Sequence, residues 1–177
     1  MEGRDGYWWP KKDEAGSTIA PEPFAPSEGG ADGSAMAMRG AGKTSSGAKA
    51  WGAGFGVNFL SQKGALYDAS QHAGVAFKAR VDEKSTRHIR FKIGDANTHA
   101  DAGICKTCWN HFGKDLTLTP TWKTYTVLFS ETKQELFWGD PRPTTVTPSK
   151  LVAIDWSIGT GQDFDLWIDD LTFVDCR

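Results

Sequence analysis

Several short segments of the chain alternate between apolar and polar residues, with the two-residue period that places successive side chains on opposite faces of a β-strand. They are residues 75–81, 88–93, 125–129, 152–158 and 164–173. No segment keeps a convincing helical period over ten residues. Short alternating strands separated by Gly- and Pro-rich turns predict an all-β fold of two stacked antiparallel sheets, a β-sandwich of the jelly-roll type.

The same alternation assigns side chains to faces. The residues predicted to point into the core are Val75, Phe77, Ala79, Val81, Ile89, Phe91, Ile93, Tyr125, Val127, Phe129, Val152, Ile154, Trp156 and Ile158. The residues predicted to point outward are Lys78, Arg80, His88, Arg90, Lys92, Asp155 and Ser157. The outer faces therefore carry many charged side chains, more than solvation alone requires.

The last alternating segment, residues 164–173, changes phase part-way along. Its first inward residues are Phe164, Leu166 and Ile168, and its outward residues are Asp165 and Trp167. Leu171 and Phe173 can also point inward only if an extra residue is absorbed at Asp169–Asp170, as a β-bulge does. The sequence therefore predicts a strand with a core face, an outer face and a pair of carboxylates at a bulge.

Size and charge limit the kinds of partner. The chain has 177 residues, enough for one domain, and we treat residues 1–177 as a single domain. Its formal net charge is −2, so we expect neither a nucleic-acid partner nor an anionic membrane. No apolar run reaches the roughly 18 residues of a membrane span, and the first residues do not form a signal peptide. We expect a soluble protein whose export signal was removed or lay further upstream.

The N-terminal part predicts one strand followed by a long irregular stretch. Residues 6–10 predict a strand that begins almost at once, as in a domain excised from a longer protein. In residues 11–36, Pro21, Pro23 and Pro26 are spaced too closely for a helix or a central strand, so we expect a surface excursion without a site. Residues 36–40 predict a strand, and the Gly-rich residues 40–47 predict a turn.

Residues 51–59 predict a strand with one nearly bare face. Trp51, Phe55, Val57 and Phe59 share one face, and Gly52, Gly54 and Gly56 share the other. Glycine weakens a strand unless something approaches the backbone closely. Either a large side chain from a neighbouring strand or a ligand covers this face, and we favour packing. The eight Trp residues of the chain exceed what a core of this size holds, so some should face solvent or ligand.

The loop around residues 95–113 carries a Cys-x-x-Cys pair, Cys105 and Cys108, followed by Trp109 and His111. One interpretation is half of a zinc site completed by Cys176 or His99, but a second close-spaced pair is missing. A second is a disulfide joining Cys105 to Cys108, or either of them to Cys176, and we prefer a short disulfide that clamps the loop. A thioredoxin-like redox centre lacks the helix that it needs.

Six short motifs occur in order along nearly the whole chain. They are GRDGYWW at 3–9, WGAGFG at 51–56, YDAS at 67–70, CWNHFG at 108–113, LTLT at 116–119 and FDLWIDD at 164–170. In this order they resemble the β-jelly-roll carbohydrate-binding modules attached to bacterial glycoside hydrolases. The resemblance implies a non-catalytic, calcium-containing sandwich that holds a polysaccharide on a concave sheet or at loop tips.

Sugar recognition needs two kinds of side chain. The apolar C–H face of a pyranose ring stacks on an aromatic ring, and its hydroxyls need hydrogen-bond donors and acceptors. The outward residues that meet these needs, provided that their strands are neighbours in one sheet, are His88, Arg90, Asp155, Asp165 and Trp167. The alternatives are weak surface charge pairs and, for Trp167, packing under a loop. A second candidate site lies at the loop tips and comprises Trp109, His111 and Trp138.

A calcium ion is the expected cofactor. Asp169 and Asp170 lie at the predicted bulge, where carboxylate and carbonyl oxygens can converge as Ca²⁺ requires. The resembling modules hold a structural Ca²⁺ near this point and the first strand. We therefore expect Asp170 and Asp169 as ligands, with Asp5 as a further one. The alternative is that these aspartates only cap the turn at the bulge.

Together, the resemblance and the residues predict a non-catalytic module that binds a plant cell-wall polysaccharide, preferably a β-glucan, although a xylan or a mannan fits the same argument. We expect a secreted monomer linked to the catalytic domain of a glycoside hydrolase. One alternative is a structural or protein-docking β-sandwich of a secreted multidomain protein. Another is a glycan-active enzyme that uses Asp155 and Asp165 as acid and base.

Overall fold

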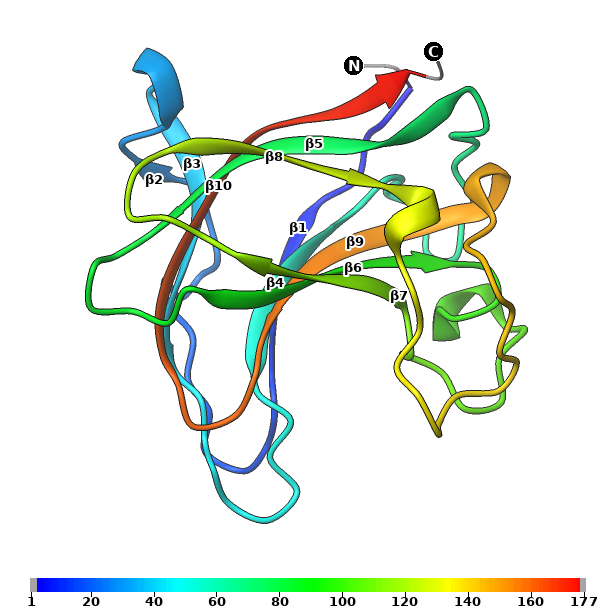
Figure 1. Cartoon of the computed structure of the whole chain (residues 1–177), viewed down its shortest axis with the longest axis horizontal. Helices are drawn as coiled ribbons and strands as arrows, with labels where there is room; N and C mark the ends of the chain where they lie inside the picture. The colour runs from blue at the N-terminus through cyan, green and yellow to red at the C-terminus, as the bar shows by residue number, and fades with distance from the viewer. Residues whose placement is uncertain (1–2, 176–177) are drawn as a thin grey trace.

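The computed structural model describes residues 3–175 and shows two five-stranded sheets stacked face to face (Figure 1). Sheet A has the order β1 (Trp8–Lys12), β4 (Ala53–Asn58), β9 (Leu151–Ile158), β6 (His88–Asp95) and β7 (Phe112–Thr117). Sheet B has the order β2 (Ser27–Glu28), β3 (Met36–Lys43), β10 (Asp163–Asp175), β5 (His72–Val81) and β8 (Lys123–Leu128). All pairings between these strands are antiparallel, so the predicted all-β jelly-roll sandwich is confirmed.

Helical structure in residues 3–175 is limited to four short 3₁₀ turns. They are η1 (Ala31–Gly33), η2 (Ala100–Ala102), η3 (Phe129–Glu131) and η4 (Pro148–Lys150). No helix in this part of the chain is long and apolar enough to cross a membrane.

The core fills the space between the two sheets and centres on Trp156. The rings of Phe55, Phe77 and Phe91 pack around its indole, with centroids 5.2–6.1 Å away. The residues predicted to point inward from the strand pattern are buried, except Tyr125, Leu171 and Phe173, which are half-buried. Burying each such side chain stabilises the fold by about 1.5–3 kcal/mol, which is why the alternation determines which face of each strand turns inward.

The predicted bulge in the last strand is present. The pairing of β10 with β5 shifts register between Asp169 and Thr172, and Asp170 adopts a φ of 47°. After the bulge, the ring of Phe173 stacks on Tyr67 at 5.4 Å and on Phe59 at 5.6 Å. The extra residue thus returns the second half of the strand to the apolar side, as expected.

Two boundaries differ from the sequence prediction. Lys11 and Lys12 continue β1, and Ser27–Glu28 pairs with β3, so the predicted 11–36 excursion is partly β-structure. Strand β3 continues to Lys43 through glycines that were expected to turn. A Cβ atom on Gly40 would lie 2.6 Å from the Phe55 ring, so a small residue is needed there for packing and not for a turn.

Candidate functional site

The outer face of sheet A carries two rows of side chains that cross all five strands. The first row consists of Lys11, Gly54, Ser157, Arg90 and Asp115. The second row consists of Trp9, Gly56, Asp155, Lys92 and Gly113. Residues that pair directly across antiparallel strands share a face, so these rows form one continuous polar surface.

The bare glycine face of β4 belongs to this surface and is covered by β1. A Cβ atom on Gly56 would lie 2.6 Å from the Trp9 ring. Lys11 reaches across the strand, where its Nζ donates to Ser157 Oγ at 2.7 Å and to the carboxylate of Asp155. Packing by a neighbouring strand, the favoured alternative, therefore accounts for this face.

Asp155 is buried in this arrangement, with 2% of its side chain exposed. Burial raises the pKa of its carboxyl, but Lys11, His111 and Lys92 together more than offset this, Lys11 foremost, and lower the pKa below its ordinary value. Asp155 is therefore a carboxylate near neutral pH and is poorly suited to act as a general acid. Asp165, its imagined partner in catalysis, belongs to β10 in the other sheet.

A groove of about 490 Å³ runs over this face of sheet A. Its polar lining comes from strands and from the connection after η3, and consists of His88, Arg90, Lys92, Asp115, Thr117, Glu135 and Ser157. Trp51, with 53% of its surface exposed, lines the same groove. The groove thus combines an exposed indole with charged donors and acceptors.

Three groups in the groove are incompletely hydrogen-bonded. Arg90 donates to Asp115 and to the carbonyl of Lys133, both at 2.9 Å, but its Nε is buried without a hydrogen-bond partner. The Oε1 atom of Glu135 lies 3.6 Å from that Nε and 3.7 Å from Nζ of Lys92, beyond hydrogen-bond length. The side chains of Lys92 and Glu135 keep exposed surface in the groove, so a polar ligand can complete their hydrogen bonds there, whereas the Arg90 Nε is covered.

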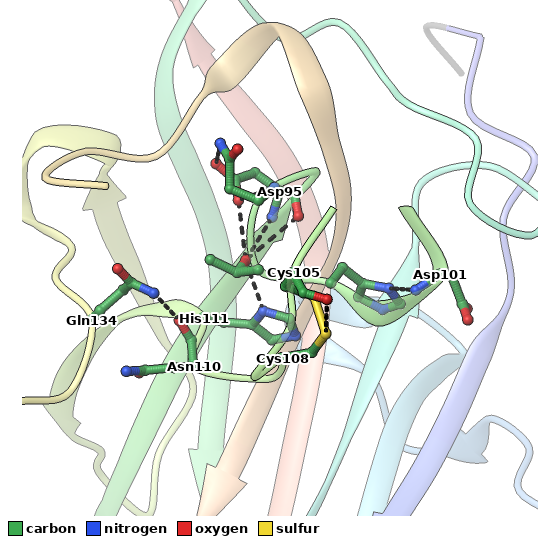
Figure 2. The surroundings of a disulfide bond; sticks show 10 residues. Asp95, Asp101, Cys105, Cys108, Asn110, His111 and Gln134 are labelled. Carbon is green, nitrogen blue, oxygen red and sulfur yellow. Dashed lines mark hydrogen bonds between the residues drawn. A yellow bond between two sulfur atoms is a disulfide. The ribbon is translucent and has the colours of Figure 1, made fainter. Parts of the chain in front are cut away.

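Glu135 is held in place by a buried amide, Asn110, that sequence reasoning did not select. Asn110 Nδ2 donates to the carbonyls of Glu135 at 2.9 Å and Trp138 at 2.6 Å, and its Oδ1 accepts from the N–H of Glu135 at 2.9 Å. Gln134 donates to the Asn110 carbonyl at 2.7 Å (Figure 2). Trp138 Nε1 donates to Glu135 Oε2 at 3.0 Å, so Trp138 supports this wall of the groove.

The loop that carries Asn110 also contains a disulfide between Cys105 and Cys108, with an S–S distance of 2.06 Å (Figure 2). Both sulfurs are therefore unavailable as thiolate ligands, and Cys176 lies outside the described residues. No group of three His, Cys, Asp or Glu suited to a metal is found in residues 3–175. The zinc alternative lacks its ligands in this part of the chain.

His111 and Trp109 lie differently in that loop. His111 is buried, its Nδ1 lies 3.0 Å from Thr98 Oγ1, and burial lowers its pKa to about 3. Trp109 is 52% exposed with a φ of 76°. Of this pair, therefore, Trp109 is accessible to a ligand and His111 anchors the loop.

Trp167 and Asp165 lie on the outer face of sheet B, away from Arg90, His88 and Asp155. The side chain of Arg39 bonds both carboxylate oxygens of Asp165, at 2.9 and 2.5 Å. The guanidinium groups of Arg39 and Arg80 cover the Trp167 ring at 4.8 and 4.3 Å, leaving 7% of it exposed. The five expected sugar contacts do not share one sheet, because β10 pairs with β3 and β5 and not with β9. The prediction that they form one site is therefore wrong.

The aspartates expected to bind calcium have other partners. Lys78 Nζ lies 2.6 Å from Asp170 and 2.6 Å from Asp32, while Asp169 accepts from the N–H of Ala31 at 2.8 Å. Asp5 accepts two hydrogen bonds from Ser61 instead. Ca²⁺ takes six to eight oxygen ligands. As arranged, these residues do not form that shell, and calcium binding stays a prediction.

Comparison with known proteins relies on structure. No family model and no curated protein matches the sequence. A family 11 carbohydrate-binding module of a cellulosomal cellulase of Clostridium thermocellum superimposes with a TM-score of 0.69 at 16% identity, over 96% of this chain and 88% of that one. A family 30 module gives a TM-score of 0.62 at 10% identity, over 93% and 91% of the two chains. This chain has the fold of carbohydrate-binding modules.

Within this carbohydrate-binding-module fold, the structure brings together His88 and Arg90 from the expected set, with Asp155 in the adjacent row. It adds Lys92, Asp115, Glu135 and Trp51 to them. Lys92 was already predicted to face outward, so its strand position was a usable signal. The contribution of Glu135 could not be read from the sequence, because it depends on how the connection after η3 folds back over sheet A.

Proposed function

We propose that this chain is a non-catalytic carbohydrate-binding module that holds a polysaccharide in the groove of sheet A. The observation that carries the proposal is the trio of Arg90 Nε, Lys92 Nζ and Glu135 Oε1 beside the exposed Trp51. A sugar hydroxyl both accepts and donates hydrogen bonds, so it can accept from Lys92 while donating to Glu135. The indole offers an apolar surface for the C–H face of the ring.

The balance of charge favours a neutral polysaccharide. Arg90 and Lys92 are matched in the groove by Asp115 and Glu135. Because these charges balance, the groove has no excess positive charge with which to hold the carboxylate of an acidic sugar. A β-glucan of the plant cell wall is our preferred ligand, and a family 11 module of the same fold is described in complex with a β-1,3-1,4-mixed-linked tetrasaccharide.

Weak, reversible binding is the expected regime. One stacked ring contributes about 0.5–1.5 kcal/mol beyond area burial, and each net hydrogen bond about 1 kcal/mol. After the entropy cost of association, a few such contacts give dissociation constants in the micromolar to millimolar range.

Retention on insoluble polysaccharides tests this proposal. Wild-type protein should be retained by a β-glucan, with xylan and mannan as the competing ligands. Trp51→Ala and Lys92→Ala should each weaken retention about fivefold, since each removes contacts worth about 1 kcal/mol. Trp109→Ala is the matched control, because Trp109 is equally exposed at 52%.

Loss of retention in Trp109→Ala alone would move the site to the loop tips. No retention of the folded wild-type protein on any of the three polymers would favour the structural or protein-docking alternative. Release of soluble sugars from them would favour an enzyme.

We further propose that the module is a secreted monomer attached to a catalytic domain of a glycoside hydrolase. The disulfide between Cys105 and Cys108 supports an oxidising compartment. Counting thiols in the denatured, unreduced protein should give one free thiol from the three cysteines of the sequence. Three free thiols in an oxidised preparation would count against secretion.

A further inference from the structure

Trp51 separates two hollows in the surface. One is the groove of sheet A. The other, of about 500 Å³, is lined by Lys12, Glu14, Ala15, Ala48, Lys49 and Trp51 itself. Because the same exposed indole lines both hollows, a ligand that stacks on Trp51 in the groove borders directly on the second hollow.

The rim between the hollows is held by a buried carboxylate. Asp13 Oδ2 accepts hydrogen bonds from the backbone N–H of Trp51 at 3.1 Å and of Gly52 at 2.9 Å. Its Oδ1 accepts from the N–H of Ala15 at 3.0 Å. One side chain, 4% exposed, therefore fixes both Trp51 and a wall residue of the second hollow.

The backbone at Gly52 adds to this rigidity. Gly52 adopts a φ of 109°, and a Cβ atom there would lie 1.9 Å from the carbonyl oxygen of Ile158. Only glycine fits that close approach. The backbone that carries the indole is thus fixed, which lowers the entropy cost of binding against it.

The second hollow has the same kinds of group as the first. Lys12 and Lys49 bring donors, Glu14 brings an acceptor, and the methyl groups of Ala15 and Ala48 add apolar surface. These are the groups that sugar hydroxyls and C–H faces need. Its polar side chains, although fewer, therefore repeat the chemistry of the groove.

We propose that the second hollow is a further sugar-binding subsite and that one polysaccharide chain runs past Trp51 from the groove into it. This inference rests on the proposed function and makes the ligand class more specific. The module would recognise an extended stretch of a polysaccharide chain and not an isolated short oligosaccharide.

Chain-length dependence tests this inference by calorimetric titration with three-unit and six-unit β-1,4-linked oligosaccharides of glucose, xylose and mannose. The longer oligosaccharide of the preferred sugar should bind about thirtyfold more tightly, as about two added hydrogen bonds imply. Ala48→Trp, which fills the hollow, should remove most of this gain and leave the affinity for the three-unit sugar unchanged. Lys12→Ala should reduce the gain.

Ala35→Trp, an equally bulky change at an exposed position outside both hollows, is the matched control and should keep the full gain. Circular dichroism verifies the fold of each variant. A longer sugar can also bind in more registers, so each variant is compared with wild type at the same length.

An undiminished gain in folded Ala48→Trp overturns the subsite alone. Absence of binding by wild type at either length, for all three sugars, overturns the proposed function as well.

Discussion

The imidazole of His111 lies against Gly94 of β6, where a Cβ atom would be 2.8 Å from the ring. Burial lowers its pKa to about 3, below the ordinary value of 6.5. In the unfolded chain the same group takes up a proton as the pH falls through 6.5, while in the folded chain it stays neutral down to about pH 3. The unfolded state therefore binds more protons in this window, and His111 makes the fold less stable as the pH falls.

We predict that His111→Asn reduces the loss of stability between pH 7 and pH 4. The amide can still reach Thr98, and it does not titrate. Given about 1.4 kcal/mol per pKa unit, the wild-type protein should lose on the order of 3 kcal/mol more than the variant over that range. Urea unfolding at several pH values measures this difference, and parallel curves for the two proteins would show that His111 is not the group responsible.

At the scale of elements, strand β10 shows what local pattern can and cannot predict. Alternation correctly placed Leu166 and Ile168 inside and indicated the bulge at Asp169–Asp170, because both follow from neighbouring residues. It could not say which sheet β10 joins, since pairing with β3 and β5 depends on contacts distant in sequence. For this reason the outward Trp167 was grouped with Arg90, although the two residues lie on opposite sides of the sandwich.

The glycines illustrate the same limit. A run of glycines between residues 40 and 47 predicted a turn from composition alone. In the structure, Gly40 and Gly42 are strand residues whose missing side chains make room for the Phe55 ring and the Thr18 carbonyl. Glycines in the sequence indicate that another group lies close to the backbone, and only the fold shows which group it is.

We predict that Trp167→Ala destabilises the fold and leaves sugar binding unchanged. Trp167 is packed between Arg39 and Arg80, and its ring centroid lies 6.5 Å from that of Trp122 in an edge-to-face arrangement. Removing a buried indole costs about 3–5 kcal/mol, and these cation–π contacts are lost as well. Chemical denaturation measures the loss, and titration at a temperature where the variant is folded measures binding. A variant as stable as wild type that no longer binds would assign Trp167 to the ligand site.

At the scale of the whole molecule, the two outer faces of the sandwich differ in how well their polar groups are paired. On sheet B, Asp165 is neutralised by Arg39, and Asp170 by Lys78. On sheet A, Arg90, Lys92 and Glu135 are left with incomplete hydrogen bonding beside an exposed indole. Incompletely hydrogen-bonded groups gathered on one face indicate where a ligand adds stability.

Calcium belongs to this scale because a bound ion would join segments distant in sequence. The prediction from the sequence is that EDTA lowers the melting temperature and that purified protein contains calcium. In the structure the positive charge beside Asp32 and Asp170 is the ammonium of Lys78, which contacts both carboxylates. An unchanged melting temperature, with no metal in the protein, would contradict the calcium prediction. Lys78 would then be the cation that balances Asp170.

The most direct test of the groove as the binding surface is NMR titration of nitrogen-15-labelled protein with a soluble β-glucan oligosaccharide, observing the side-chain N–H groups of Trp and Arg. We predict that the largest shifts occur at the Trp51 indole and at Nε–H of Arg90, while Trp167 and Arg80 stay unchanged. The largest shifts at Trp109 and Trp138, or at Trp167 and Arg80, with Trp51 and Arg90 unchanged, would contradict it.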